Sequence, residues 1–156
     1  MDIAPDELAG IADLFGGLSR PELREAVENV AARRGASFDP ESLAADVEAA
    51  RREYYLLVVE MDDVPVIAPG PAALPRLPEH AEDLPHMMDV TGREIGRERL
   101  AEAAHERLTA DADRAIGDDN RERIDVLVDV SYDVEAWGSV DVAGVRARLL
   151  DARERS

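Results

Sequence analysis

The strongest constraint on the fold is a change of apolar period near residue 54. Up to that point apolar side chains recur every three or four positions, which is typical of one helix face. The run at 54–61, Tyr-Tyr-Leu-Leu-Val-Val-Glu-Met, is instead rich in β-branched and aromatic residues, as strands are. Asp62-Asp63 then offers a turn, and residues 64–68 can pair back as a second strand. The sequence therefore predicts helices followed by an antiparallel hairpin.

Capping residues mark where the helices begin and end. We expect a first helix over residues 5–15. Ser19 and Glu22 form an S-x-x-E capping box that opens a second helix, and Gly35 ends it. Asp39, followed by proline at the first helical position, opens a third helix that runs to the hairpin.

The rest of the chain divides into a proline-rich stretch and further helices. Six of the nine prolines lie between residues 65 and 85, so 69–92 is predicted to be an extended connector with one short turn at 79–83. Its leucines, Leu74, Leu77 and Leu84, are expected to hold it against the domain surface. Helices resume at about Gly96, continue after a cap at 118–120, and end with a helix capped by Asp141. Tyr132 and Trp137 are expected in the bend before that last helix.

These elements predict a mainly helical α+β fold. Three helices and a hairpin, residues 1–68, follow the order of a winged helix-turn-helix. Residues 69–92 form the connector, and the C-terminal helical region, 93–156, packs against the first half as one compact unit. The alternative is a small helical domain with a hairpin and no relation to DNA-binding folds.

The most distinctive feature of the composition is its negative charge. There are 35 acidic residues and 18 basic ones, all arginine, for a net charge of −17. Such a surface keeps a protein dispersed, and molar salt confines its self-repulsion to about 3 Å. The pattern predicts a protein adapted to a salt-rich cytoplasm. An ordinary acidic protein from a G- and C-rich genome is the alternative, and it explains the arginines better than it explains the charge.

Several chemistries are excluded. The chain has no cysteine, which removes disulfides, thiolate nucleophiles and cysteine-based zinc sites. It has no lysine for a P-loop, and neither G-x-G-x-x-G nor G-x-S-x-G occurs. No apolar run approaches the roughly 20 residues of a membrane span. The acidic N-terminus differs from a secretion signal, so a cytoplasmic location is expected.

A winged helix would read DNA with its third helix, and charge argues against that here. The third helix carries four acids against Arg51 and Arg52, and the hairpin tip is Asp62-Asp63. Both surfaces would repel phosphate, so nucleic acid is disfavoured as a partner. A regulator that binds DNA through a few arginines in high salt stays open as an alternative.

Two small groups of residues are candidate sites. His80, His86 and Asp89 could contribute to a metal site. The favoured alternative is an acidic loop whose histidines cap or hydrogen-bond nearby backbone. Tyr132 and Trp137 are candidate interface anchors, with core packing as the alternative. No catalytic residue and no cofactor is predicted.

Three segments together carry a resemblance: 14–18 with the following Glu22-Leu23, 78–83, and 132–137. In these the chain resembles a family of small acidic haloarchaeal proteins over nearly its whole length. The resemblance implies a halophilic source and supplies no activity or functional residues. The predicted function is a non-enzymatic interaction or regulatory module that binds a protein partner or self-associates. The alternatives are a DNA-binding transcriptional regulator and a metal-dependent enzyme using His80 and His86.

Overall fold

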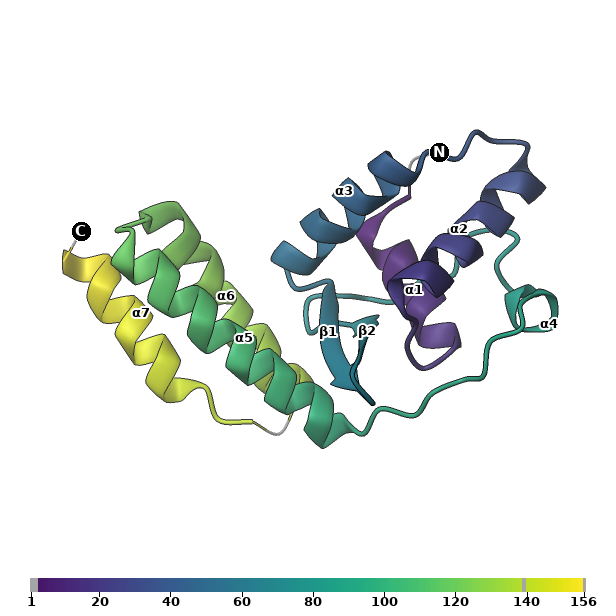
Figure 1. Cartoon of the computed structure of the whole chain (residues 1–156). Coiled ribbons are helices and arrows are strands. Elements are labelled where there is room, and N and C mark those ends of the chain that lie inside the picture. Colours follow the sequence, from purple (N-terminus) through teal and green to yellow (C-terminus); the bar gives the residue numbers. More distant parts are fainter. Residues whose placement is uncertain (1–2, 139, 156) are drawn as a thin grey trace. The chain divides into compact units, whose positions relative to one another are not determined.

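The computed structural model describes residues 3–138 and 140–155, and the chain divides after Ile95 into two compact units. The predicted mainly helical α+β fold class is confirmed. The N-terminal unit contains three helices, a hairpin and one short helix: α1 (Pro5–Leu14), α2 (Arg20–Arg34), α3 (Pro40–Arg52), β1 (Leu56–Met61), β2 (Val64–Pro69) and α4 (Leu84–Met87). The C-terminal unit contains α5 (Arg97–Gly117), α6 (Arg121–Trp137) and α7 (Ala143–Arg155) (Figure 1).

The helix boundaries of the N-terminal unit follow the predicted caps. The Ser19 hydroxyl accepts the Glu22 backbone N–H at 3.4 Å, and the Glu22 carboxylate accepts the Ser19 N–H at 2.8 Å. Gly35 ends α2 in the left-handed region with φ of 65°, which glycine adopts without steric cost. The Asp39 carboxylate accepts the Glu41 N–H at 3.1 Å and so begins α3.

The hairpin forms as predicted, and the residue just before the cap of α2 is hydrogen-bonded to β2. Asp62 and Asp63 both have positive φ, 51° and 65°, as a two-residue turn between twisted strands requires. Val59 pairs with Val66 in the antiparallel register. Leu18, one residue before the cap of α2, exchanges two backbone hydrogen bonds with Ile67, at 3.0 and 2.7 Å. The first turn of α2 is therefore fixed next to β2.

The core of the N-terminal unit is centred on α1. Its inner face, formed by Leu8, Ile11, Ala12 and Phe15 at i, i+3, i+4 and i+7, is buried. This helix packs against α2, α3 and both strands, and its side chains join those of α2, α3, Leu56 and Ile67 in one cluster. Segments far apart in sequence thus enclose one apolar core.

The connector is held by buried apolar side chains and by backbone hydrogen bonds, which corrects part of the prediction. Leu84 is buried at the start of α4, as expected, but Leu74 is 79% exposed and Leu77 is 40% exposed. The backbone N–H of Leu74 instead donates to the Asp6 carboxylate at 3.0 Å, and that of Arg76 donates to the Asp6 carbonyl at 3.0 Å. Near Leu74 the connector is therefore held through its backbone, and of the three leucines only Leu84 is buried.

Farther along, Arg93 ties the end of the connector to the turn between α1 and α2. Its backbone N–H donates to the Phe15 carbonyl at 2.7 Å. Its guanidinium donates to the Gly17 carbonyl at 3.1 Å and to the Glu22 carboxylate at 2.6 Å. One arginine therefore joins the connector to the capping box of α2.

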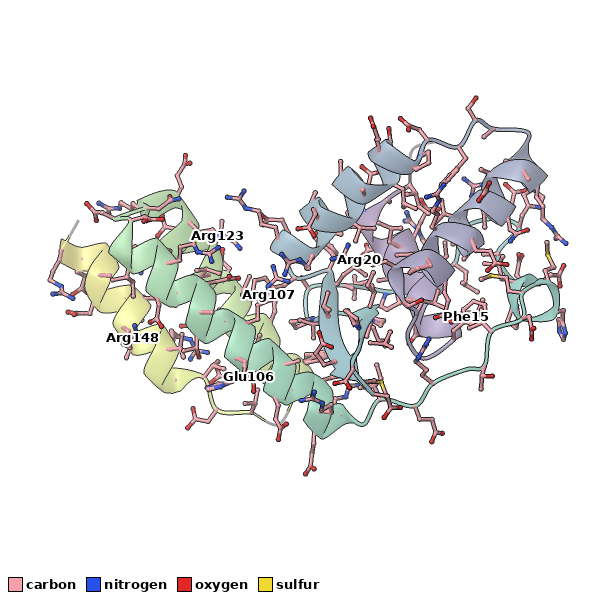
Figure 2. All side chains as sticks on the ribbon, in the orientation of Figure 1. Phe15, Arg20, Glu106, Arg107, Arg123 and Arg148 are labelled. Carbon is pink, nitrogen blue, oxygen red and sulfur yellow. The ribbon has the colours of Figure 1, made fainter. Side chains whose placement is uncertain are left out.

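In the C-terminal unit α5, α6 and α7 lie side by side, each in contact with the other two (Figure 1). The Asn120 side chain caps α6 by accepting the Arg123 N–H at 3.1 Å, and Asp141 accepts the Ala143 N–H at 2.9 Å. Arg107 of α5 and Arg123 of α6 both approach the carboxylate of Asp111, at 3.4 and 3.7 Å (Figure 2). Charged pairs as well as apolar contacts link these helices.

The prediction of a bend at Tyr132 and Trp137 was wrong. Both residues lie on α6, which continues to Trp137. Val130 and Val134 are buried one turn apart and extend the inner face of the helix, so packing in this unit carries the helix past the predicted end.

Within residues 3–138 and 140–155, no helix combines the length and the apolar character needed to cross a membrane.

Candidate functional site

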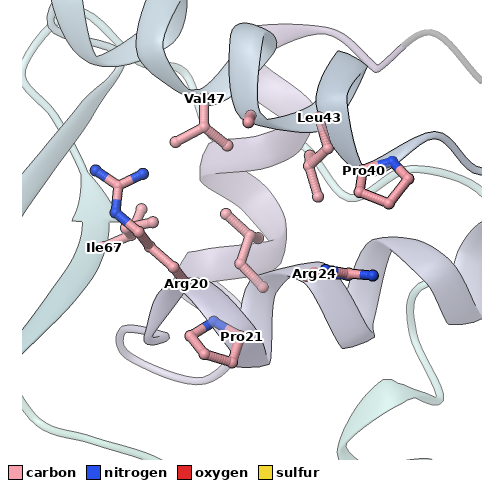
Figure 3. Close-up of a pocket in the computed structure, with 9 residues that line it drawn as sticks. Arg20, Pro21, Arg24, Pro40, Leu43, Val47 and Ile67 are labelled. Carbon is pink, nitrogen blue, oxygen red and sulfur yellow. The ribbon is translucent and has the colours of Figure 1, made fainter.

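A hollow of about 320 Å³ lies between α2 and α3 in the N-terminal unit. One wall is the first turn of α2, and the other is a stripe along α3, with Ile67 of β2 beneath (Figure 3). The stripe residues recur at i, i+3, i+4 and i+7, which is one helix face. The lining is Arg20, Pro21, Leu23 and Arg24 from α2, Pro40, Leu43, Ala44 and Val47 from α3, and Ile67.

The floor of the hollow is apolar and its mouth is open to solvent. Leu23 and Ile67 are each 1% exposed, Val47 is 4% exposed and Leu43 is 7% exposed. Around them the two prolines, Ala44 and both arginines are exposed. The volume lies near the lower end of the roughly 300–1,000 Å³ typical of ligand sites. The hollow can therefore receive apolar side chains from outside.

Arg20 belongs to an ion-pair network at the mouth. Its guanidinium lies 3.4 Å from the Glu48 carboxylate, which also accepts a hydrogen bond from Arg51 at 3.2 Å. The hydrogen bond from Arg51, together with the charges of Arg51 and Arg20, outweighs burial and lowers the pKa of Glu48. Glu48 is therefore ionised at neutral pH and neutralises part of the positive charge on this side.

Arg24 is placed differently. Its guanidinium lies 6.0 Å from the centre of the Phe38 ring, within the range of a cation–π contact. Among the residues that the structure describes, no carboxylate lies within 4.0 Å of Arg24. The hollow thus has an exposed cation at its mouth with no ion-pair partner in the described part of the chain.

The metal candidates are spread over the connector and α4. His80 has a positive φ of 75°, and its Nε2 lies 3.8 Å from the carboxylate of its neighbour Glu79. His86 lies on α4, and Asp89 follows that helix; both are exposed. In the described ranges 3–138 and 140–155, no three histidine, aspartate or glutamate side chains are grouped as a metal would require. His80, His86 and Asp89 remain candidates from sequence alone.

Both candidate interface aromatics stack on arginines of their own unit. The guanidinium of Arg146 lies 3.9 Å from the centre of the Tyr132 ring, and that of Arg97 lies 5.0 Å from the Trp137 ring. Tyr132 is 54% exposed, and Trp137 is half-buried. Their role as interface anchors stays a prediction.

Sequence reasoning missed the hollow, although two signals for it were present. Arg20 and Arg24 stand four residues apart on α2, on either side of the buried Leu23. On α3, the exposed Ala44 lies in the same stripe as Leu43 and Val47. These patterns show which face of each helix is apolar. They do not show that the two faces leave space between them, because that depends on how both helices pack on α1.

The comparisons with known proteins give one match. A model described as a family of unknown function, DUF7109, matches residues 6–154. No curated protein and no solved structure matches the chain.

Proposed function

We propose that this chain, which belongs to DUF7109, a family of unknown function, is a non-enzymatic interaction module that binds a protein partner in the hollow between α2 and α3. The observation that carries the proposal is the nature of this hollow. It combines a buried apolar floor with an exposed cationic mouth in a chain of net charge −17. An apolar concavity with a few polar groups at its rim is the usual form of a binding site.

The proposed setting is the salt-rich cytoplasm of a haloarchaeon. The excess of carboxylates and the use of arginine alone as a base support this setting. In molar salt charges act only over about 3 Å, so long-range attraction contributes little to association. A partner would then be held by buried apolar surface and by ion pairs in direct contact, and the hollow offers both.

The DNA-binding alternative has the order of three helices and a hairpin in its favour. The charges oppose it. Glu41, Glu48 and Glu53 are exposed on or at the end of α3, and Asp62-Asp63 occupy the hairpin turn. A phosphate backbone approaching these surfaces would meet carboxylates. A protein partner is therefore the better-supported proposal.

The test compares two substitutions on α3. Ala44→Glu places a carboxylate at the hollow, where docking would bury it, while Ala49→Glu makes the same change at an exposed position of α3 outside the lining. Tagged full-length wild type and both variants are used to purify partners from native lysate in molar KCl. The recovered protein is then tested for binding with purified components.

We expect the wild type and Ala49→Glu to bind the same protein in the purified system, and Ala44→Glu to lose it. Docking would bury the new carboxylate beside the apolar floor, which is costly, so the loss should exceed tenfold in affinity. Equal binding by Ala44→Glu would contradict the proposal, as would the absence of any binding partner for the wild type. Circular dichroism of the two variants checks that both are folded.

A further inference from the structure

The charge of the hollow is opposite to that of the chain around it. Its nine lining residues include two arginines and no acid, although the chain contains 35 acids and 18 arginines. The chain as a whole has nearly two acids for every base and would attract basic ligands. At the mouth of the hollow, however, the two arginines would repel a basic ligand. Charge complementarity therefore favours an occupant that carries carboxylates.

Arg24 is the group best placed to contact such an occupant. One side of its guanidinium is near the Phe38 ring, at 6.0 Å, which restricts the orientation of the side chain. In the described part of the chain no carboxylate pairs with it, so a ligand would not have to displace one. Arg20, by contrast, is shared with Glu48. A carboxylate of the ligand would therefore pair first with Arg24.

The shape of the hollow limits the apolar part of the occupant. The lining stripe of α3 runs from Pro40 to Val47, seven residue steps, or about 10 Å of helix. About two helical turns of a ligand match this length. Two facing helices with an apolar strip between them are also the usual receptor for an amphipathic helix, which inserts side chains at i, i+3 and i+4.

We infer that the occupant is a short acidic amphipathic helix of a partner protein. Its apolar side chains enter the hollow, and a carboxylate at its edge pairs with Arg24. This inference rests on the proposed function and specifies the chemical class of the partner segment.

The test uses two synthetic helical peptides with the same apolar stripe. One has glutamates along the edges of the stripe, and the other has glutamines at the same positions. Binding of each to the full-length chain is measured by fluorescence anisotropy in molar KCl. The variants are Arg24→Gln, Ala44→Glu and, as a control, Arg33→Gln. Arg33 is exposed on the same helix, outside the lining, where it pairs with Asp83 at 3.4 Å.

We expect the wild type to bind the glutamate peptide about fivefold more tightly than the glutamine peptide, the size of one exposed ion pair. Arg24→Gln should remove most of this preference, and Arg33→Gln should keep it. Ala44→Glu should abolish binding of both peptides. An unchanged preference in Arg24→Gln would overturn the inference.

The remaining outcomes separate this inference from the proposed function. The two peptides could bind equally well, with Ala44→Glu abolishing the binding of both. That result would overturn only the inference that the partner helix is acidic, because the hollow would still bind a protein segment. If neither peptide binds but decanoate does, in a manner sensitive to Ala44→Glu, the hollow takes small amphiphilic anions and both proposals fail. Concentration-dependent dimerisation that Ala44→Glu abolishes would make the occupant a second copy and overturn the inference.

Discussion

The two units of this chain build their cores in different ways. In the N-terminal unit, side chains from α1, α2, α3 and the hairpin meet across long stretches of sequence, and Leu18 pairs with Ile67 through the backbone. In the C-terminal unit three consecutive helices pack together, and each contacts the other two. The long-range packing of α2 and α3 on α1 leaves a hollow between them, whereas the core of the C-terminal unit is built from neighbouring helices that contact one another directly.

Arginines also serve the two units differently. In the N-terminal unit Arg93 anchors the connector to the cap of α2 through Glu22. In the C-terminal unit Arg146 of α7 donates to the buried Ser131 of α6 and pairs with Glu135. An arginine thus fixes a loop in one unit and joins two helices in the other.

The largest expected effect comes from the core of the N-terminal unit. Leu8 is fully buried on α1, so Leu8→Ala should lower the free energy of unfolding by about 3 kcal/mol through lost burial and a residual cavity. Denaturant unfolding in molar KCl, followed by far-UV circular dichroism, measures the change. Trp137, the single tryptophan, reports on the other unit. The midpoint of the Trp137 fluorescence transition should shift less than the midpoint measured by circular dichroism. An equal shift of both midpoints would contradict the existence of two separate cores.

Glycines in helices of the two units should respond in opposite directions. A Cβ on Gly10 of α1 would lie 2.2 Å from the Arg76 carbonyl oxygen, while a Cβ on Gly144 of α7 has nothing within 4 Å. Gly10→Ala should destabilise the protein by about 2 kcal/mol through overpacking. Gly144→Ala should stabilise it by about 0.5 kcal/mol through helix propensity. Denaturant midpoints measure both changes. Stabilisation by Gly10→Ala would contradict the close approach of the Arg76 backbone to Gly10.

Two arginines of α7 test whether burial decides the value of an ion pair. Arg146 is 14% exposed and donates to Ser131 Oγ at 2.8 Å, whereas Arg148 is 50% exposed and pairs with Asp113 at the surface. Arg146→Met should cost about 2 kcal/mol, because it leaves Glu135 without its partner. Arg148→Met should cost less than about 0.5 kcal/mol. Thermal unfolding in low and molar KCl compares them, and equal costs would argue against this ranking.

The smallest effects are expected from two carboxylates with opposite pKa shifts. Burial alone would raise the pKa of Glu22, but hydrogen bonds from Arg93 and Ser19 outweigh it and lower the pKa below 4.5. Burial and the charge of Asp129 raise the pKa of Asp133 above 3.8. Ionised Glu22 therefore stabilises the fold above pH 4.5, and this contribution is lost as the pH falls through the folded pKa. Ionised Asp133 destabilises the fold, and protonation removes that effect.

At neutral pH, Glu22→Gln should accordingly be less stable than the wild type, and Asp133→Asn should be slightly more stable. Both differences should shrink on acidification to about pH 3. Unfolding at low protein concentration, followed across this range by circular dichroism, gives the two curves. A difference of the same sign for both variants would refute the opposite roles assigned to these carboxylates.

Local patterns predicted most of the secondary structure because caps and turns depend on neighbouring residues. Ser19 with Glu22, Asp39 before Pro40, and Asp62-Asp63 all act as the sequence indicated. The predictions failed where distant contacts decide the outcome. Tyr132 lies on a helix that packs on its neighbours, and Leu74 is exposed although its backbone is bound to Asp6.

By itself the sequence determined the charge of this protein, the exclusion of cysteine chemistry and the positions of its principal helices and hairpin. Each of these depends on residue identity or on contacts within a few positions. The hollow between α2 and α3 was decided only by the tertiary structure. Leu23 and Val47 belong to ordinary apolar stripes, and only the packing of both helices on α1 leaves space between those stripes, with Arg24 at the mouth. The periodicity of a sequence shows which face of a single helix is apolar, whereas a hollow depends on the distance between the faces of two helices.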